Sequence, residues 1–178
     1  MILILGGTKS GKTAYAEKIA KEYSLKNSCS VVYMATAQAW DEEMKVRIRK
    51  HKESRPDTWI TFEEPLNICS VFNEISLQNK GIILFDCLTM WMSNLLMTLD
   101  DNFKKEEAET FVIKKMQEFL EGANLFQGEI VIISNLTETG LISPSFLGRT
   151  FQDLSGICHQ MIASKSDSVY QLTAGMTS

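Results

Sequence analysis

A glycine-rich segment near the start of the chain has the residue types and the spacing of a phosphate-binding loop. It matches the pattern G-x-x-x-x-G-K-[ST] at Gly6, Gly11, Lys12 and Thr13. In such a loop the glycines let successive backbone N–H groups point at one anion, and the helix that follows adds the positive end of its dipole. We expect Lys12 to reach the β/γ-phosphates and to face solvent without a ligand. The alternative is a glycine-rich turn with a solvated lysine.

An acidic residue, Asp86, ends the apolar run GIILFD. In enzymes with a phosphate-binding loop, a carboxylate at the end of a buried strand lies near the metal ion. Aspartate also caps helices, and a helix is expected to begin close by, near Thr89. Beside the glycine-rich loop, the sequence predicts that Asp86 and the Thr13 hydroxyl hold Mg²⁺, with helix capping as the alternative.

One of the two histidines, His51, lies in a basic segment where it can act as a nucleophile. Met44, Ile48 and His51 have the spacing i, i+4, i+7 and share one helix face. A neutral imidazole attacks phosphorus, and neighbouring cations would hold a triphosphate. These cations are Lys45, Arg47, Arg49, Lys50, Lys52 and Arg55. Two other interpretations stay open: a histidine that complements the dipole at a helix C-terminus, and a solvated basic face.

The elements that must position these residues alternate along the chain. Apolar, β-branched runs predict strands at residues 1–5, 30–36, 58–62, 81–86, 129–135 and 168–173. Amphipathic segments predict helices at about residues 12–24, 40–53, 65–78, 88–98, 103–122 and 146–164. Nearly continuous apolar runs are typical of a parallel sheet that is covered on both faces. With the loop motif, this predicts an α/β, three-layer P-loop NTPase fold (RecA-like), as a single domain over residues 1–178.

Composition limits the function classes. The formal net charge of −4 disfavours nucleic-acid binding, which needs a basic face. The four cysteines have no metal-ligand spacing, which favours buried free thiols in a reducing cytoplasm. No targeting segment is visible, and polar residues interrupt the longest apolar stretch, so we expect no membrane span and a cytoplasmic location.

Nearly the whole chain resembles the bifunctional adenosylcobinamide kinase / adenosylcobinamide-phosphate guanylyltransferase family of cobalamin biosynthesis. The resemblance is carried by LILGGTKSGKTAYAE, VVYMATAQAWDEEM, RIRKHKESRPDTW and IILFDCLTMWMSNLL. Further matches are Asn135, Gly140, Arg149, Phe151, Asp153, Gly156 and Gln160. The stretch around His51 is the most family-specific part, because many unrelated enzymes share the P-loop.

The resemblance implies that His51 takes GMP from GTP and passes it to adenosylcobinamide phosphate, and that the same chain phosphorylates adenosylcobinamide. His51 and Lys12 would be catalytic. The implied nucleotide-binding residues are Gly6, Gly7, Thr8, Lys9, Ser10, Gly11, Lys12, Thr13, Arg55, Glu63 and Asp86. GTP and ATP would be substrates beside the corrinoid, Mg²⁺ would be the cofactor, and the protein would be a homo-oligomer, a trimer as in the family.

Two places depart from the family pattern. The family usually has N-E-[VI]-G after the fifth strand, whereas this chain has Leu136 in place of the glutamate and Glu138 in place of the glycine. The family's asparagine before Gln160 is His159 here. These departures motivate one alternative, a nucleotide-binding copy with reduced activity. A second alternative is another small P-loop kinase that transfers only a γ-phosphate, which explains the loop and Asp86 but leaves the stretch around His51 as a solvated face.

Overall fold

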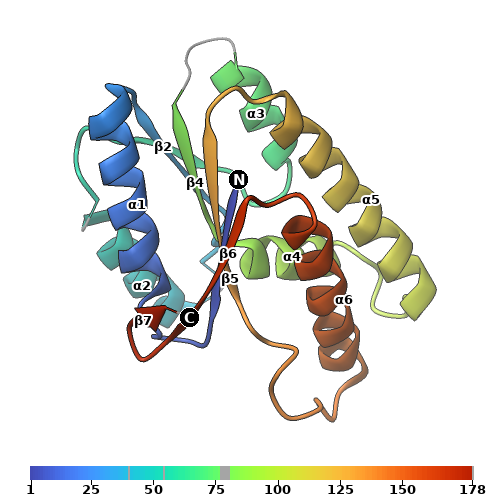
Figure 1. The fold of residues 1–178 in the computed structure, drawn as a ribbon. Helices are drawn as coiled ribbons and strands as arrows, with labels where there is room; N and C mark the ends of the chain where they lie inside the picture. The colour runs from blue at the N-terminus through green and yellow to red at the C-terminus, as the bar shows by residue number, and fades with distance from the viewer. Residues whose placement is uncertain (40, 54, 77–80, 178) are drawn as a thin grey trace.

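One seven-stranded sheet forms the centre of the protein (Figure 1). The computed structural model describes residues 1–178 except 40, 54, 77–80 and 178. The strands are β1 (Ile2–Gly6), β2 (Val31–Ala35), β3 (Ile60–Glu63), β4 (Ile82–Asp86), β5 (Glu129–Asn135), β6 (Ser168–Thr173) and β7 (Met176–Thr177). Their order is β3-β2-β4-β5-β1-β6-β7, and all neighbours are parallel except β6 and β7. The predicted mostly parallel sheet is confirmed.

The helices follow the strands as expected. They are α1 (Lys12–Asn27), α2 (Glu42–Glu53), α3 (Ile68–Ser76), α4 (Leu88–Leu96), α5 (Lys105–Leu125) and α6 (Phe146–Ala163). Residues 40 and 77–78 of the predicted helices lie outside the described residues. None of the helices in the described part of the chain combines the length and the apolar character needed to cross a membrane.

Helix α3 begins at Ile68, whereas the sequence predicted a start at about residue 65. The Glu64 carboxylate accepts hydrogen bonds from the backbone N–H groups of Leu66 (2.9 Å) and Asn67 (2.8 Å). A side chain that binds nearby backbone donors competes with helical hydrogen bonding. The segment therefore forms a turn, and the helix begins at Ile68.

Helices cover both faces of the sheet, with α1 and α2 on one side and α3 to α6 on the other (Figure 1). Alternate residues of each strand point to opposite faces, so Leu3 packs into one apolar cluster and Ile4 into the other. The larger cluster includes Trp91 and Phe119, and the smaller one includes Ala16 of α1. Burial on both faces explains why the central strands β1, β2, β4 and β5 have nearly continuous apolar sequences.

The parallel arrangement brings the carboxyl ends of five strands to one edge of the sheet. These ends carry Gly6 of β1, Ala35 of β2, Glu63 of β3, Asp86 of β4 and Asn135 of β5. Gly6 and Asn135 are register partners, and so are Ala35 and Asp86. In open α/β sheets, ligands bind outside this edge.

Candidate functional site

A cavity of about 630 Å³ lies at this edge. That volume is in the range of small-molecule sites. Its wall is formed by the loop between β1 and α1, the first turn of α1, one face of α2, one residue of α4, and residues in or just after the last part of four strands. The wall residues are Thr8, Lys9, Ser10, Gly11, Lys12, Thr13, Ala14, Ala35, Ala37, Ala39, Met44, Ile48, His51, Arg55, Glu63, Asp86, Cys87, Met90, Ile133 and Asn135. The structure therefore brings together residues that are far apart in the sequence.

Lys12, at the end of the glycine-rich loop, forms hydrogen bonds with other residues of the same loop. Lys12 Nζ donates to the Gly7 carbonyl at 2.6 Å and to Ser10 Oγ at 3.4 Å. Lys12 is only 7% exposed, so the expectation that it faces solvent without a ligand is wrong. The loop turns through Lys9 (φ 58°) and Gly11 (φ 94°), and the left-handed conformation at Gly11 favours glycine. The ammonium thus lies inside the loop before any anion binds.

Two expected loop residues, Gly6 and Gly7, are not in the cavity wall within the described chain. Gly6 has a packing role, because a Cβ there would lie 2.6 Å from the carbonyl oxygen of Leu172 in β6 and 2.6 Å from Ser10 Oγ. Gly7 contributes the carbonyl that accepts from Lys12. These two glycines therefore shape the loop rather than line the cavity.

Asp86 lies at the end of β4, directly before a cis peptide bond to Cys87. The Tyr33 hydroxyl of β2 donates a hydrogen bond to Asp86 Oδ2. Burial and the Asp86 charge raise the pKa of Tyr33, so the phenol keeps its proton and remains a donor. The helix-capping alternative is not supported, because the N-cap residue of α4 is Cys87 and no side chain caps this helix.

Tyr33 also holds the arginine that follows α2. The Arg55 guanidinium carbon lies 3.6 Å from the centroid of the Tyr33 ring, a cation–π contact. The Trp59 ring stacks on Tyr33 with centroids 6.2 Å apart. Arg55 Nε is buried and has no hydrogen-bond partner among the described residues. A buried donor of this kind fits an anionic ligand in the cavity.

His51 lies in the last turn of α2, on the face that lines the cavity. Met44 and Ile48 line it as well, as their spacing predicted. The position in the last turn also suits interaction with the helix dipole. Beside this face, Lys52 Nζ pairs with Glu63 Oε1 at 2.7 Å and joins α2 to the end of β3. Both partners are more than half exposed, so this ion pair contributes little stability.

Among the described residues, no group of three or more His, Cys, Asp and Glu side chains is arranged to hold a metal ion. The expected donors Thr13 and Asp86 do line the same cavity. A hydroxyl and a carboxylate are oxygen donors of the kind that Mg²⁺ prefers, and Mg²⁺ takes its other ligands from water and substrate phosphates. The donor set therefore fits the expected ion.

Sequence reasoning missed two residues near the site. In the sequence, Tyr33 was predicted only as part of an apolar strand. Glu17 of α1 lies one helical turn after Thr13, and burial raises its pKa. The Asp86 charge raises the pKa of Glu17 further, whereas His51 acts in the opposite direction. The spacing i, i+4 from Thr13 was the only signal for Glu17.

Two family-matching residues act on the backbone around the cavity. Asn94 Nδ2 donates to the carbonyls of Thr36 (2.7 Å) and Pro65 (3.0 Å) and thereby ties α4 to the segments after β2 and β3. Thr89 Oγ1 accepts from the backbone N–H of Asn135 at 2.7 Å. Both side chains are buried. They fix the positions of the segments at the ends of these strands, and neither residue is part of the cavity wall within the described chain.

All four cysteines are free; Cys87 and Cys158 are buried and the other two are partly exposed. Burial raises the pKa of Cys87 and of Cys158 to about 12. The thiolate is the reactive form, and it predominates only above that pH. Although Cys87 lines the cavity, it is therefore a poor nucleophile at neutral pH.

We expect iodoacetamide to leave Cys87 and Cys158 unmodified in the folded protein at about pH 7.5, because both groups are buried and protonated. Peptide mapping by mass spectrometry checks this result. The same protein unfolded in urea is the control, and all four cysteines should react there. Alkylation of native Cys87 at the rate of a free thiol would contradict the argument.

Comparisons with known proteins agree with the geometry. The model of the family described as "Cobinamide kinase / cobinamide phosphate guanyltransferase" matches residues 2–178. The chain is 37% identical over 174 residues to "Bifunctional adenosylcobalamin biosynthesis protein CobP" of Pseudomonas aeruginosa, covering 98% of this chain and 93% of that protein. It is 28% identical over 181 residues to "Bifunctional adenosylcobalamin biosynthesis protein CobU" of Escherichia coli, covering 99% and 97%.

A solved structure of an ATPase domain shares the fold. It superposes on this chain with a TM-score of 0.55 at 16% identity, covering 96% of this chain and 68% of that chain. At this identity the likeness concerns the fold alone. It confirms the predicted RecA-like P-loop architecture.

Proposed function

Because the chain belongs to the cobinamide kinase / cobinamide phosphate guanyltransferase family, we propose that the cavity at the carboxyl edge of the sheet serves both family reactions. The protein is a bifunctional enzyme of adenosylcobalamin biosynthesis, and nucleotides are its substrates. The observation that carries the proposal is that His51 and the glycine-rich loop line the same cavity. A nucleotide held by the loop would then lie against the helix face of the nucleophile.

In the guanylyl transfer, an imidazole nitrogen of His51 attacks the α-phosphorus of GTP. A P–N bond forms, the bond from the α-phosphorus to the bridging oxygen breaks, and pyrophosphate leaves. A phosphate oxygen of adenosylcobinamide phosphate then attacks the same phosphorus, so the P–N bond breaks and His51 is restored. The products are adenosylcobinamide-GDP and free enzyme.

In the kinase reaction, the aminopropanol hydroxyl of adenosylcobinamide attacks the γ-phosphorus of ATP or GTP. No protein nucleophile is needed. Lys12 would reach the β/γ-phosphates from the loop, and Arg55 would offer its buried Nε to a phosphate oxygen. Thr13 and Asp86 would hold Mg²⁺, which neutralises phosphate charge when bound. Both reactions therefore depend on positioning and charge neutralisation by the same residues.

The direct test is the intact mass of the protein after incubation with GTP and Mg²⁺. We expect an increase the size of GMP, together with release of pyrophosphate. A protein that only transfers the γ-phosphate would hydrolyse or transfer it without any mass increase. A nucleotide-binding copy with reduced activity would bind GTP but show neither product. Absence of the adduct while the kinase activity is present would overturn the guanylyl-histidine.

Asp86→Asn should reduce Mg²⁺-dependent turnover by about 100-fold, because the amide carries no charge for the ion. The stability should change little, since the amide oxygen can still accept from the Tyr33 hydroxyl. Steady-state kinetics over a Mg²⁺ titration and a thermal melt measure the two effects. A less stable variant with full specific activity would show instead that Asp86 is structural.

Three further proposals concern the protein as a whole. Residues 1–178 act as one nucleotide-binding domain, supported by the single sheet that runs from β1 to β7. The protein works as a homo-oligomer, a trimer by family resemblance, which analytical ultracentrifugation tests. Its place is the cytoplasm, consistent with four free cysteines.

A further inference from the structure

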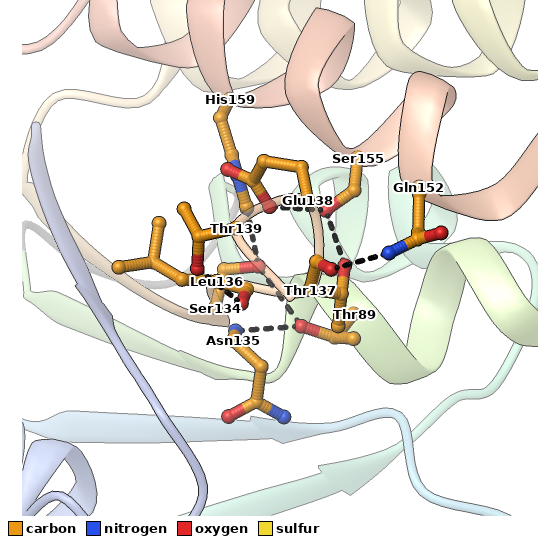
Figure 2. A network of polar contacts seen from close by, with 10 residues as sticks. All are labelled: Thr89, Ser134, Asn135, Leu136, Thr137, Glu138, Thr139, Gln152, Ser155 and His159. Atoms are coloured by element: carbon orange, nitrogen blue, oxygen red, sulfur yellow. Dashed lines mark hydrogen bonds and ion pairs between the residues drawn. The ribbon is translucent and has the colours of Figure 1, made fainter. Parts of the chain in front are cut away.

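Two of the three residues that depart from the family pattern, Glu138 and His159, meet in one network of hydrogen bonds (Figure 2). His159 of α6 lies between two partners. Its Nδ1 is 2.7 Å from Oε1 of Glu138, in the loop after β5, and its Nε2 is 2.7 Å from Oγ of Ser134, in β5. His159 is 5% exposed. Glu138 and His159, which replace a glycine and an asparagine of the family pattern, thus contact each other.

The carboxylate of Glu138 is itself held in place. Ser155 Oγ of α6 donates to Glu138 Oε2 at 3.2 Å, and Thr137 Oγ1 donates to Ser155 Oγ at 2.9 Å. Gln152 Nε2 donates to the Thr137 carbonyl at 3.1 Å. Helix α6 therefore fixes the loop after β5 through three side chains.

The network continues from His159 to the cavity. Ser134 Oγ lies 2.9 Å from Thr89 Oγ1, and Thr89 Oγ1 accepts from the backbone N–H of Asn135 at 2.7 Å. Asn135 lines the cavity, and Figure 2 shows its side chain pointing away from the network. Its register partner is Gly6, where the phosphate-binding loop begins. The chain of contacts thus ends at the backbone of a residue that faces the nucleotide site.

The order of carboxylate, imidazole and hydroxyl is that of a serine hydrolase triad. A triad serine must reach its substrate, however, and Ser134 is 0% exposed and does not line the cavity. Its oxygen is also in contact with Thr89. Ser134 therefore cannot reach a substrate, which excludes a hydrolytic role. The network instead ends at the backbone N–H of Asn135.

The hydrogen bonds can all point in one direction. A carboxylate only accepts, so His159 Nδ1–H donates to Glu138 and, in the neutral imidazole, Nε2 accepts from the Ser134 hydroxyl. Ser134 then accepts from the Thr89 hydroxyl, whose oxygen accepts from Asn135 N–H. Each donor in this chain has one acceptor. Hydrogen bonds aligned in this way polarise and strengthen one another in a buried environment.

We infer that Glu138 and His159 are positioning residues that hold Asn135 against the nucleotide through Ser134 and Thr89. The inference rests on the proposed function and assigns a role to two residues outside the cavity wall. The Asn135 amide is then the group that meets the phosphates or the attacking atom. Because the two substituted residues contact each other, they act as one unit.

The test is a mutant cycle read by the rate of GMP-adduct formation. Glu138→Ala should lower this rate constant by about tenfold, with the GTP KM within about twofold, as for other outer residues that orient a site. Asn135→Ala should lower the rate constant at least as much, because it removes the amide that Glu138 positions. In the Asn135→Ala background, Glu138→Ala should cost nothing further, because its effect passes through Asn135. Glu138→Gln should restore most of the rate, since its amide oxygen can accept from Nδ1–H.

Glu118→Ala is the matched control, because it removes a carboxylate that pairs with Lys115 at 2.8 Å on α5 and does not line the cavity. If Glu138→Ala does not fold, His159→Asn, which carries the family's residue, completes the same cycle. Additive losses in the double variant, or full rate in Asn135→Ala, would overturn the inference while the wild-type adduct still supports the proposed function. A wild-type protein without any adduct would instead refute the proposed function itself.

Discussion

The His51→Asn protein is expected to take up no label from GTP labelled at the α-phosphate and to lose guanylyl transfer entirely. Asparagine keeps a polar side chain of similar reach, yet it has no nucleophilic nitrogen. Phosphorylation of adenosylcobinamide should persist at least in part, because that reaction needs Lys12, Mg²⁺ and an oriented hydroxyl but no protein nucleophile. Radiolabel on the protein and a separate kinase assay measure the two activities. The wild-type adduct should be acid-labile and base-stable, as a phosphoramidate is.

The control for this variant is Lys50→Asn, an exposed position beside His51 on the same helix. It should keep the label, since its side chain does not line the cavity. Lysine can also form a phosphoramidate, so peptide mapping of the labelled protein must locate the adduct. Label on Lys50 or Lys52, or a fully labelled His51→Asn protein, would return His51 to the role of a cation at a helix end.

Lys12→Ala is expected to weaken GTP binding by about 100-fold and to lower both activities, because it removes the cation of the loop that reaches the β/γ-phosphates. Isothermal calorimetry measures the affinity. The free energy of unfolding should change by only about 1 kcal/mol, since the lost hydrogen bonds to Gly7 and Ser10 are offset by no longer burying an ammonium.

Lys26→Ala, an exposed lysine in the last turn of the same helix, is the control and should bind GTP like the wild type. Unchanged affinity in Lys12→Ala would show that the glycine-rich loop does not bind the nucleotide phosphates. A large loss of stability with normal affinity would show that its contact with Gly7 is only structural.

The central strands β1, β2, β4 and β5 were predictable because burial on both faces leaves a local signal, an unbroken apolar run. The short strand β7 was not predicted, because two residues are too few to show a periodic pattern. Its hairpin with β6 depends on the left-handed conformations of Ala174 and Gly175. The start of α3 was wrong because one carboxylate, that of Glu64, binds the backbone ahead of it. Local side-chain hydrogen bonds of this kind do not change the hydrophobic pattern.

The residues around the cavity were predictable where a motif fixes them, as for Lys12 and Asp86. The burial of Lys12 could not be predicted, because its hydrogen-bond acceptor is the backbone carbonyl of Gly7, which no sequence pattern marks. The resemblance to the family did single out Glu138 and His159 as departures from its pattern. Their contact depends on how α6 packs beside β5, which is a tertiary relation between positions 21 residues apart.

The hydrogen bond from Lys12 to the Gly7 carbonyl decides at which stage the ammonium group loses its bound water. With Nζ 2.6 Å from the Gly7 carbonyl and the residue 7% exposed, the ammonium has already given up most of its hydration shell during folding. An arriving phosphate therefore exchanges one oxygen ligand for another and displaces little water from this cation. Nucleotide binding should then show a smaller dehydration entropy than binding to an exposed lysine, because the Gly7 carbonyl already replaces water at this cation before the nucleotide arrives.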